Sequence, residues 1–295
     1  PTTVKGMIDY YETKQHPITR KMVLEGYKRV RENKGSAGID GQSLEDFAEQ
    51  LTGNIYKIWN RMTSGSYYPL SVREVQIPKK TGGTRGLGIP TVTDRIAQQV
   101  VKSYLEPKVE GSFHENSYGY RPNKSAHQAL EEARYRCNTY GWVIDLDIRG
   151  FFDNIDHELM MRAVEWYTKE KWVLMYVDRW LKAGIMQEGL IKSRDKGTPQ
   201  GGVISPLLAN IYLHFTFDMW MKKTYPNMPF ERYCDDMIVH CWSESQAKFI
   251  KDKITERMKE CKLELNEDKT QIVYCKNYRR KEEHKQISFT FLGYT

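Results

Sequence analysis

Two short apolar stretches, each broken by a pair of carboxylates, constrain this chain more than any other feature. Residues 142–148 contain Asp145 and Asp147, and Asp235 and Asp236 stand together between apolar neighbours. An unpaired buried carboxylate is costly, so acids in such stretches are paired, bound to a metal ion or turned to the surface. Residues two apart share one face of a strand, so Asp145 and Asp147 point the same way.

Carboxylates gathered from two neighbouring strands predict a metal site. Adjacent like charges repel unless a cation lies between them, and hard carboxylate oxygens favour Mg²⁺ or Mn²⁺ over zinc. Three such groups can hold two divalent ions about 4 Å apart, the arrangement that performs in-line nucleotidyl transfer. An Asp-Asp turn alone is more often only a solvated hairpin turn, so the prediction depends on the second acidic strand.

The composition agrees with a folded protein that binds a polyanion. The 295 residues are 40% hydrophobic and 28% charged, with a net charge of +7. This charge is a weak signal, equally compatible with nucleic acid binding and with an ordinary basic surface. No apolar run approaches the ~18 residues of a membrane span. The five cysteines form no CxxC pair, which favours reduced thiols in the cytoplasm over zinc or disulfides.

The local patterns predict alternating helices and strands, typical of an α+β or α/β fold. Predicted helices cover residues 18–32, 43–62, 94–106, 125–138, 157–167, 170–182, 205–221 and 243–261. Predicted strands cover residues 72–78, 85–89, 142–148, 263–265, 271–274 and 287–292. A hairpin joins the first two of these strands, and further hairpins are predicted at 185–194 and around Asp235. Ser43 with Asp46, and Ser243 with Gln246, form capping-box patterns.

Several motifs resemble one known family. Tyr233-Cys234-Asp235-Asp236 resembles the YxDD box of reverse transcriptases. Residues 147–157 and 197–213 resemble the first and second palm motifs of group II intron reverse transcriptases, also called maturases. Further stretches match the same family in order: residues 34–41, 86–91, 118–122 and 291–294. The resemblance extends over residues 18–295.

The resemblance implies a metal-binding triad of Asp147, Asp235 and Asp236. The backbone carbonyl of Ile148 is a further expected ligand. Asp145 is the rival to Asp147; if Asp147 is the ligand, Asp145 needs a structural partner such as a nearby arginine.

Other positions imply a nucleotide pocket. By resemblance, Lys79 and Arg85 clamp the triphosphate, and Gln200 contacts the nucleotide or the template. Phe152 is the expected gate that excludes a ribose 2′-hydroxyl, with Phe151 as the alternative. Without the resemblance, Lys79 and Arg85 would be interpreted as solvated charges and Gln200 as a turn residue. The two phenylalanines would be interpreted as core residues.

The remaining resemblances concern proton transfer, the primer and the template. Lys269 matches a lysine that can protonate the leaving pyrophosphate, and residues 291–294 match the primer-grip hairpin. The basic helix at residues 18–32 matches an N-terminal extension that contacts template RNA. Cys234 departs from the alanine most common in the family, although a small soft side chain should preserve the turn.

The predicted architecture is α+β, the fingers and palm of a right-hand polymerase with an antiparallel palm sheet backed by helices. The expected division is an N-terminal extension (1–42), mainly fingers (43–140) and mainly palm (141–295). The thumb of the family is expected to be absent, which would weaken the grip on duplex and leave an apolar surface that favours a homodimer.

The predicted function is RNA-directed DNA polymerisation in a bacterial cytoplasm, with Mg²⁺ or Mn²⁺. The expected partners are intron RNA template, DNA primer or target, and dNTPs, with no membrane. The rival hypothesis is a non-catalytic splicing cofactor that binds intron RNA on a polymerase-derived scaffold. A viral RNA-templated RNA polymerase is disfavoured by Phe152 and by the Tyr-Cys-Asp-Asp turn.

Overall fold

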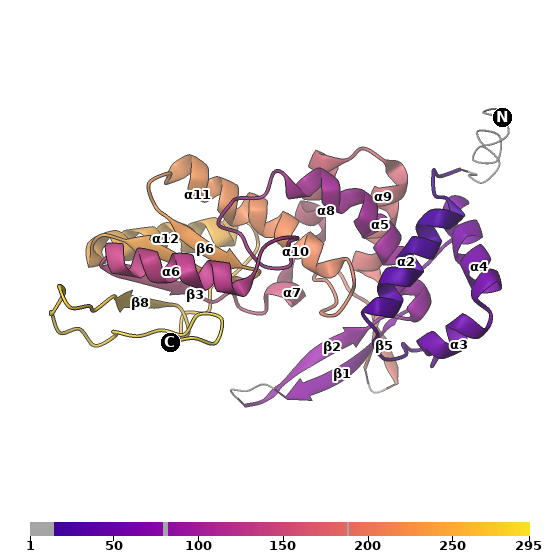
Figure 1. Ribbon diagram of the computed structural model, residues 1–295, viewed down its shortest axis with the longest axis horizontal. Coiled ribbons are helices and arrows are strands. Elements are labelled where there is room, and N and C mark those ends of the chain that lie inside the picture. The colour runs from indigo at the N-terminus through magenta and orange to yellow at the C-terminus, as the bar shows by residue number, and fades with distance from the viewer. Residues whose placement is uncertain (1–14, 79–81, 188) are drawn as a thin grey trace. The chain divides into compact units, whose positions relative to one another are not determined.

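The computed structural model describes residues 15–78, 82–187 and 189–295, and these fall into two compact units (Figure 1). The first unit contains the described parts of Pro1–Lys108 and Val164–Ser205; the second contains Val109–Ala163 and Pro206–Thr295. Both units mix helices with a sheet, which confirms the predicted α+β composition. The expected division at residues 42 and 140 stays a prediction.

The first unit joins a helical layer to a mixed sheet. Its helices are α2 (Arg20–Glu32), α3 (Leu44–Glu49), α4 (Leu51–Thr63), most of α5 (Val92–Glu110), the end of α8 (His157–Tyr167) and α9 (Lys171–Lys182). Its strands are β1 (Val72–Pro78), β2 (Thr84–Ile89), β4 (Ile185–Gln187) and β5 (Leu190–Lys192), in the order β2-β1-β4-β5. The predicted hairpins, β1–β2 and β4–β5, are confirmed as antiparallel pairs, whereas β1 and β4 run parallel.

The predicted helix at residues 43–62 is two helices. Ser43 starts α3, and its capping box with Asp46 is present as expected: the Ser43 hydroxyl accepts from the Asp46 N–H at 3.0 Å, and the Asp46 carboxylate accepts from the Ser43 N–H at 2.9 Å. Gln50 then leaves the helical region, with φ −117° and ψ 37°, and α4 starts at the next residue. Periodicity alone could not reveal this break, because apolar residues continue on both sides.

The second unit is built around a fully antiparallel sheet. Its strands are β3 (Trp142–Leu146), β6 (Phe230–Tyr233), β7 (Asp236–Cys241) and β8 (Gln271–Tyr274), in the order β6-β7-β3-β8. Helix α6 (Ala126–Thr139) packs on β6, and α12 (Glu244–Glu260) packs on β3, β7 and β8 (Figure 1). The remaining helices are α7 (Phe151–Asn154), most of α8, most of α10 (Ser205–Leu213) and α11 (Met219–Thr224).

The predicted helix at residues 205–221 is interrupted. A π-helical turn, His214–Asp218, separates α10 from α11. The Asp218 carboxylate in this turn binds the buried Arg232 guanidinium. Such a π-turn changes where side chains project, and π-turns occur often at functional sites.

Three local predictions are wrong. Residues 263–265 and 287–292 are not strands; Leu265 forms a single bridge with Ile148, and Phe291 bridges Tyr294. The Ser243 hydroxyl caps α12 through the Gln246 N–H, but the Gln246 side chain accepts from the Trp242 N–H at 2.8 Å. The capping box is therefore only half formed.

The core of the second unit runs from α6 through the sheet to the C-terminal loop. One buried cluster joins Tyr118, Ala129, Ala133, Val143, Ile238 and Phe291. Within the described ranges, every helix is too short or too polar to cross a membrane.

Candidate active site

Two acids lie at the tip of the β6–β7 hairpin. The predicted hairpin is present, but only one of its two acids lies in the turn: Tyr233 pairs with Asp236, so Cys234 and Asp235 form the turn and Asp236 begins β7. Cys234 has φ 58° and is 4% exposed. A Cβ added to Gly119 would lie 2.5 Å from the Cys234 nitrogen, so the backbone of residue 119 packs tightly against the turn. The tip of the hairpin is therefore held in one conformation.

Asp147 reaches the same edge of the sheet from β3. Leu146 pairs with Met237, so Asp147 follows β3 beside the start of β7, where Asp236 stands. The Asp147 carbonyl accepts from the Asn266 N–H at 2.7 Å, and the Asp147 N–H donates to the Thr270 hydroxyl at 3.3 Å. The loop before β8 thus fixes the backbone of Asp147.

Burial and the charge of Asp147 raise the pKa of both hairpin acids. Burial first, then the charges of Asp235 and Asp147, raises the pKa of Asp236 to about 6. Burial also raises the pKa of Asp235, with the charge of Asp147 acting in the same direction. The Cys234 thiol opposes this shift by hydrogen bonding to the Asp235 carboxylate. The three carboxylates therefore concentrate negative charge that a cation would relieve.

The donor chemistry of this edge suits divalent ions, although the side chains are not preassembled as a metal cage. In the described part of the chain, no three His, Cys, Asp or Glu side chains are arranged so that they could hold a metal ion. Asp147 is nevertheless close enough to the hairpin acids for its charge to raise their pKa, and the three carboxylates offer hard oxygen donors of the kind that Mg²⁺ and Mn²⁺ prefer.

Asp145 lacks the arginine partner that the sequence led us to expect. Among the described residues it forms no ion pair with an arginine. Burial, followed by the charges of Asp236 and Asp147, raises the pKa of Asp145 to about 6. Asp145 pairs with Ile238 on one side and with Gln271 on the other, within the sheet rather than at its edge. Asp147 is therefore better placed at the edge that carries the hairpin turn.

A buried arginine that is not among the predicted site residues stabilises the hairpin from inside the sheet. Arg232 is fully buried and donates to both carboxylate oxygens of Asp218, at 2.7 and 2.6 Å. It also donates to the Asn210 amide oxygen at 2.9 Å and to the Cys234 carbonyl at 3.1 Å. Asn210 in turn donates to the Gly119 carbonyl at 2.7 Å. The signal in the sequence was an arginine inside an apolar strand, which must have a partner.

A second buried pair lies one residue along β6. Glu231 accepts from the Arg136 guanidinium at 2.7 Å and lies 2.6 Å from His240 Nε2. Both Glu231 and His240 are fully buried. The hairpin that carries Asp235 and Asp236 therefore has charged groups matched with partners along β6.

The two aromatic candidates occupy different environments. Phe151 is 2% exposed, whereas Phe152 is only partly buried; the rings meet edge to face with centroids 5.3 Å apart. Phe152 is thus the member of the pair that a ligand can reach. Lys269 Nζ lies 3.9 Å from Asp147 Oδ1, which places the predicted proton donor beside the acidic edge.

In the first unit, Gln200 is held against β2 by its backbone. The Gln200 carbonyl accepts from the Gly88 N–H at 2.6 Å. Gly201 has φ +107°, and a Cβ on it would lie 2.4 Å from the Gly88 carbonyl oxygen. Arg85 is exposed on the same strand, while Lys79 lies outside the described residues. The structure thus brings Gln200 to the strand that carries Arg85.

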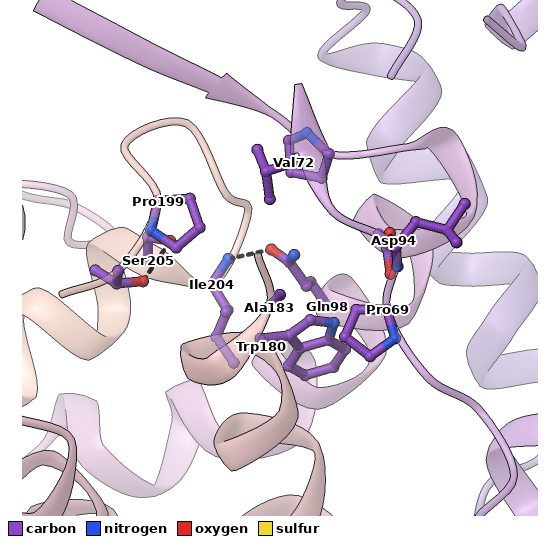
Figure 2. A pocket seen from close by; sticks show the side chains of 12 residues that line it. Pro69, Val72, Asp94, Gln98, Trp180, Ala183, Pro199, Ile204 and Ser205 are labelled. Atoms are coloured by element: carbon purple, nitrogen blue, oxygen red, sulfur yellow. Dashed lines mark hydrogen bonds between the residues drawn. The ribbon is translucent and has the colours of Figure 1, made fainter. Parts of the chain in front are cut away.

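The loop before α10 is anchored to α5. Figure 2 shows the small pocket between them, in which Gln98 of α5 accepts a hydrogen bond from the Ile204 N–H at 3.3 Å. The Thr198 and Ser205 hydroxyls lie 3.1 Å apart across the loop. Asp94 lines the same pocket, and burial raises its pKa to about 6.

The glycine-rich loop after α2 is also fixed within the first unit. Arg95 donates to the Lys34 and Ser36 carbonyls at 3.0 and 2.9 Å, and Arg73 donates to the Ala37 carbonyl at 2.6 Å. These backbone contacts give the loop a defined conformation although its sequence is rich in glycine.

Comparisons with known proteins identify the family of the chain. The model of the family "Reverse transcriptase (RNA-dependent DNA polymerase)" matches residues 77–295. The chain is 31% identical to Protein YkfC of Escherichia coli, over 87% of this chain and 74% of that protein. It is 34% identical to the group II intron-encoded protein LtrA of Lactococcus lactis, over 86% of this chain but 41% of LtrA.

A solved structure is similar in fold. An apo telomerase from Candida tropicalis matches with a TM-score of 0.59 at 17% identity, over 76% of this chain and 52% of that one. This similarity confirms the predicted right-hand polymerase fold. The family match over residues 77–295, together with this fold, defines the class of protein: a nucleotidyltransferase of the reverse transcriptase type. The chain belongs to the reverse transcriptase (RNA-dependent DNA polymerase) family, whose members generally use divalent metal ions.

Proposed function

We propose that this chain synthesises DNA on an RNA template, with Asp147, Asp235 and Asp236 as its metal-binding carboxylates. The observation that carries the proposal is the position of these acids at one edge of an antiparallel sheet, where the charge of Asp147 raises the pKa of Asp235 and of Asp236. Membership in the reverse transcriptase family supplies the reaction class.

In the proposed mechanism, the three carboxylates and the Ile148 carbonyl would hold two Mg²⁺ ions. Bound there, the ions would favour deprotonation of the primer 3′-hydroxyl and offset charge on the triphosphate. Arg232 keeps the hairpin tip rigid, so the carboxylates need little reorganisation. Lys269, beside Asp147, would donate a proton to the leaving pyrophosphate.

The first unit would bind the triphosphate and the template. Arg85 offers a planar pair of donors, and Lys79 would add a point charge. Gln200, fixed through its backbone to β2, would contact the incoming nucleotide or the template base. Phe152, in the second unit, would exclude a ribose 2′-hydroxyl.

Intron RNA is the proposed template and partner, in the cytoplasm of a bacterial cell. LtrA is named as a group II intron-encoded protein, which supports this choice. Helix α2 exposes Arg20, Lys21, Lys28, Arg29 and Arg31, a surface suited to RNA phosphates. A splicing role that needs RNA binding but no polymerisation is the second candidate, favoured by this same surface.

Primer extension tests the catalytic proposal. The protein is given a DNA primer on an RNA template with dNTPs and Mg²⁺, and Asp235→Asn is compared with Asp153→Asn. Asp153 is an exposed acid on α7 and serves as the matched control. We expect Asp235→Asn to lose DNA synthesis by at least about a thousandfold, and Asp153→Asn to keep it. Equal activity in the two variants would contradict the metal-site assignment.

Filter binding of intron RNA separates the two candidates. The Asp235→Asn variant should bind RNA as tightly as the parent protein. A Lys21→Ala/Arg31→Ala variant should bind more weakly and show a smaller dependence on salt concentration. If the parent protein binds intron RNA but never extends a primer, the splicing-cofactor function replaces the polymerase function.

The sugar gate has its own test. Phe152→Ala should raise incorporation of ribonucleotides relative to deoxyribonucleotides, because space opens beneath the sugar. Phe151→Ala should instead destabilise the fold by about 3–5 kcal/mol, since its ring is buried. A Phe152→Ala protein that still rejects ribonucleotides would place the gate elsewhere.

A further inference from the structure

Two cysteines that are far apart in sequence meet in the second unit. Cys137 lies near the C-terminal end of α6, and Cys275 directly follows β8. Both are free thiols that are only partly buried. Both side chains pack against the same buried cluster, and each sulfur shifts the pKa of the other, which places the two thiols in one neighbourhood. The contact joins the helix on one side of the sheet to its edge strand.

An arginine lies beside the pair. Arg280 donates to the Cys137 carbonyl at 2.6 Å and to the Asn138 carbonyl at 3.3 Å. Interaction with Cys137 lowers the pKa of the Cys275 thiol, burial opposes this shift, and the positive charge of Arg280 adds a smaller effect in the lowering direction. The pKa of Cys137 is raised, first by its hydrogen bond to Cys275. The two thiols are therefore unlike: Cys275 is the better nucleophile, and Cys137 keeps its proton.

Small molecules can reach the two thiols. Cys137 and Cys275 both line an open groove of about 740 Å³, formed by α6, the end of β8 and the C-terminal loop. The other cysteines, Cys234, Cys241 and Cys261, are buried. The groove thus exposes one nucleophilic thiol with a second thiol in contact.

We propose that Cys137 and Cys275 are a redox-active pair that peroxide converts to a disulfide. The Cys275 thiolate attacks one oxygen of hydrogen peroxide, the O–O bond breaks, and hydroxide leaves to become water. Cys275 is then a sulfenic acid. The Cys137 sulfur loses its proton and attacks the Cys275 sulfur; the S–O bond breaks, and hydroxide takes up a proton as a second water. One peroxide is reduced, and two thiols are oxidised.

The bond would fasten α6 to β8 beside the core of the second unit. Cys137 and Cys275 both pack against the cluster that contains Val143 of β3 and Ile238 of β7. A disulfide there closes a long loop and restricts the unfolded chain. The oxidised protein should therefore resist thermal unfolding better than the reduced protein. The inference stands on this cysteine pair alone and does not depend on the polymerase activity.

The test is oxidation of the reduced, purified protein with hydrogen peroxide, followed by peptide mapping without reductant. We expect loss of two hydrogen atoms from the intact mass, a single Cys137–Cys275 crosslink, and a rise in Tm of roughly 5 °C that dithiothreitol reverses. Cys137→Ser and Cys275→Ser should both abolish the crosslink. Cys261→Ser, which removes a buried thiol, is the matched control and should keep it.

Arg280→Ala provides a second readout that leaves both thiols in place. It should slow the oxidation severalfold and move its pH dependence to higher pH, because the thiolate of Cys275 loses a neighbouring positive charge. A crosslink between Cys241 and Cys275 would overturn the assignment, since the Cys275 charge also reaches Cys241. Oxidation that stops at sulfenic acid, with no crosslink in the parent protein, would overturn it as well.

Discussion

The two units hold their functional loops by different means. In the second unit, the hairpin that carries Asp235 and Asp236 is stabilised by buried charges, above all the pair of Arg232 and Asp218. In the first unit, the loop that carries Gln200 is held by backbone contact, with Gly88 and Gly201 too close to tolerate a side chain. The hairpin in the second unit depends on the pairing of buried charges. The loop in the first unit depends on glycines, which lack a side chain and so allow close backbone packing.

The difference follows from what each region must position. The acidic edge gathers like charges, so a nearby cation buried in the sheet offsets part of their repulsion while fixing the turn. The nucleotide loop must instead bring a backbone close to a strand, which glycine permits. Substitutions should therefore destabilise the two units for different reasons: an unbalanced charge in the second unit and a steric clash in the first.

The largest expected effect is on the buried ion pair. Arg232→Met should destabilise the fold by about 3–5 kcal/mol, because the buried Asp218 carboxylate loses both hydrogen bonds from its arginine partner, and His214 Nδ1, 3.8 Å away, is too distant to replace them. Urea unfolding measures this loss. Arg149→Met is the matched control, since Arg149 is 54% exposed in its pair with Glu264 and should cost less than about 0.5 kcal/mol.

A double variant sharpens this prediction. Arg232→Met combined with Asp218→Asn removes both charges, so part of the stability lost in Arg232→Met alone should return. If the double variant is as unstable as the sum of the single variants, packing rather than charge matching holds the hairpin, and the contrast between the units fails.

The next effect concerns close backbone approach in the first unit. Gly201→Ala should cost about 2–3 kcal/mol and raise the KM for dNTPs, because its Cβ would overlap the Gly88 carbonyl. Gly189→Ala is the control: its φ is also positive, +80°, but its Cβ would meet no atom within 4 Å. It should cost about 1 kcal/mol from backbone strain alone. Equal losses of stability in Gly201→Ala and Gly189→Ala would show that the close contact between Gly201 and the Gly88 carbonyl is unimportant.

A smaller effect tests the crowded acids of the second unit. The pKa of Asp145 is raised to about 6, so ionising its carboxyl in the folded protein costs free energy. This cost is absent below the pKa of an unfolded aspartate, near 4, and grows as the pH rises from there through 6. Asp145→Asn should therefore stabilise the metal-free protein by about 1 kcal/mol at pH 7.5, after allowance for solvent screening, and not at pH 4. Denaturation at the two pH values measures the change.

The same variant separates Asp145 from Asp147. If Asp147 is the metal ligand, Asp145→Asn should keep most of its primer-extension activity, whereas Asp147→Asn should lose it. Stabilisation of Asp145→Asn at both pH values alike would point to packing instead of charge. Loss of synthesis in Asp145→Asn as complete as in Asp147→Asn would make Asp145 a catalytic residue.

The smallest effect on stability is expected at Lys269. Its side chain is 66% exposed and 3.9 Å from Asp147, so Lys269→Ala should change the free energy of unfolding by less than about 0.5 kcal/mol. If Lys269 protonates pyrophosphate, single-turnover synthesis should slow about a hundredfold. Lys262→Ala removes another exposed lysine, paired with Asp156 at 2.8 Å, and should leave the rate unchanged.

Local signals predicted the elements well where the governing interactions are local. Strand Val72–Pro78, helix His157–Tyr167 and strand Gln271–Tyr274 have the predicted bounds. The breaks at Gln50 and at the π-turn were missed, because apolar periodicity continues through both. Residues 287–292 have a strand-like composition but no neighbouring strand to complete a ladder.

The sequence by itself determined the acids and their spacing along β3 and the hairpin, because strand periodicity and turn chemistry act over a few residues. The class of protein followed from the resemblance of several motifs, in order, to one family. Only the tertiary structure decided which partner each buried group has: Asp218 for Arg232, Gly88 for Gln200, and Cys275 for Cys137. These pairs join distant segments, and their geometry arises when the chain packs. A residue's own neighbours in sequence do not identify such partners.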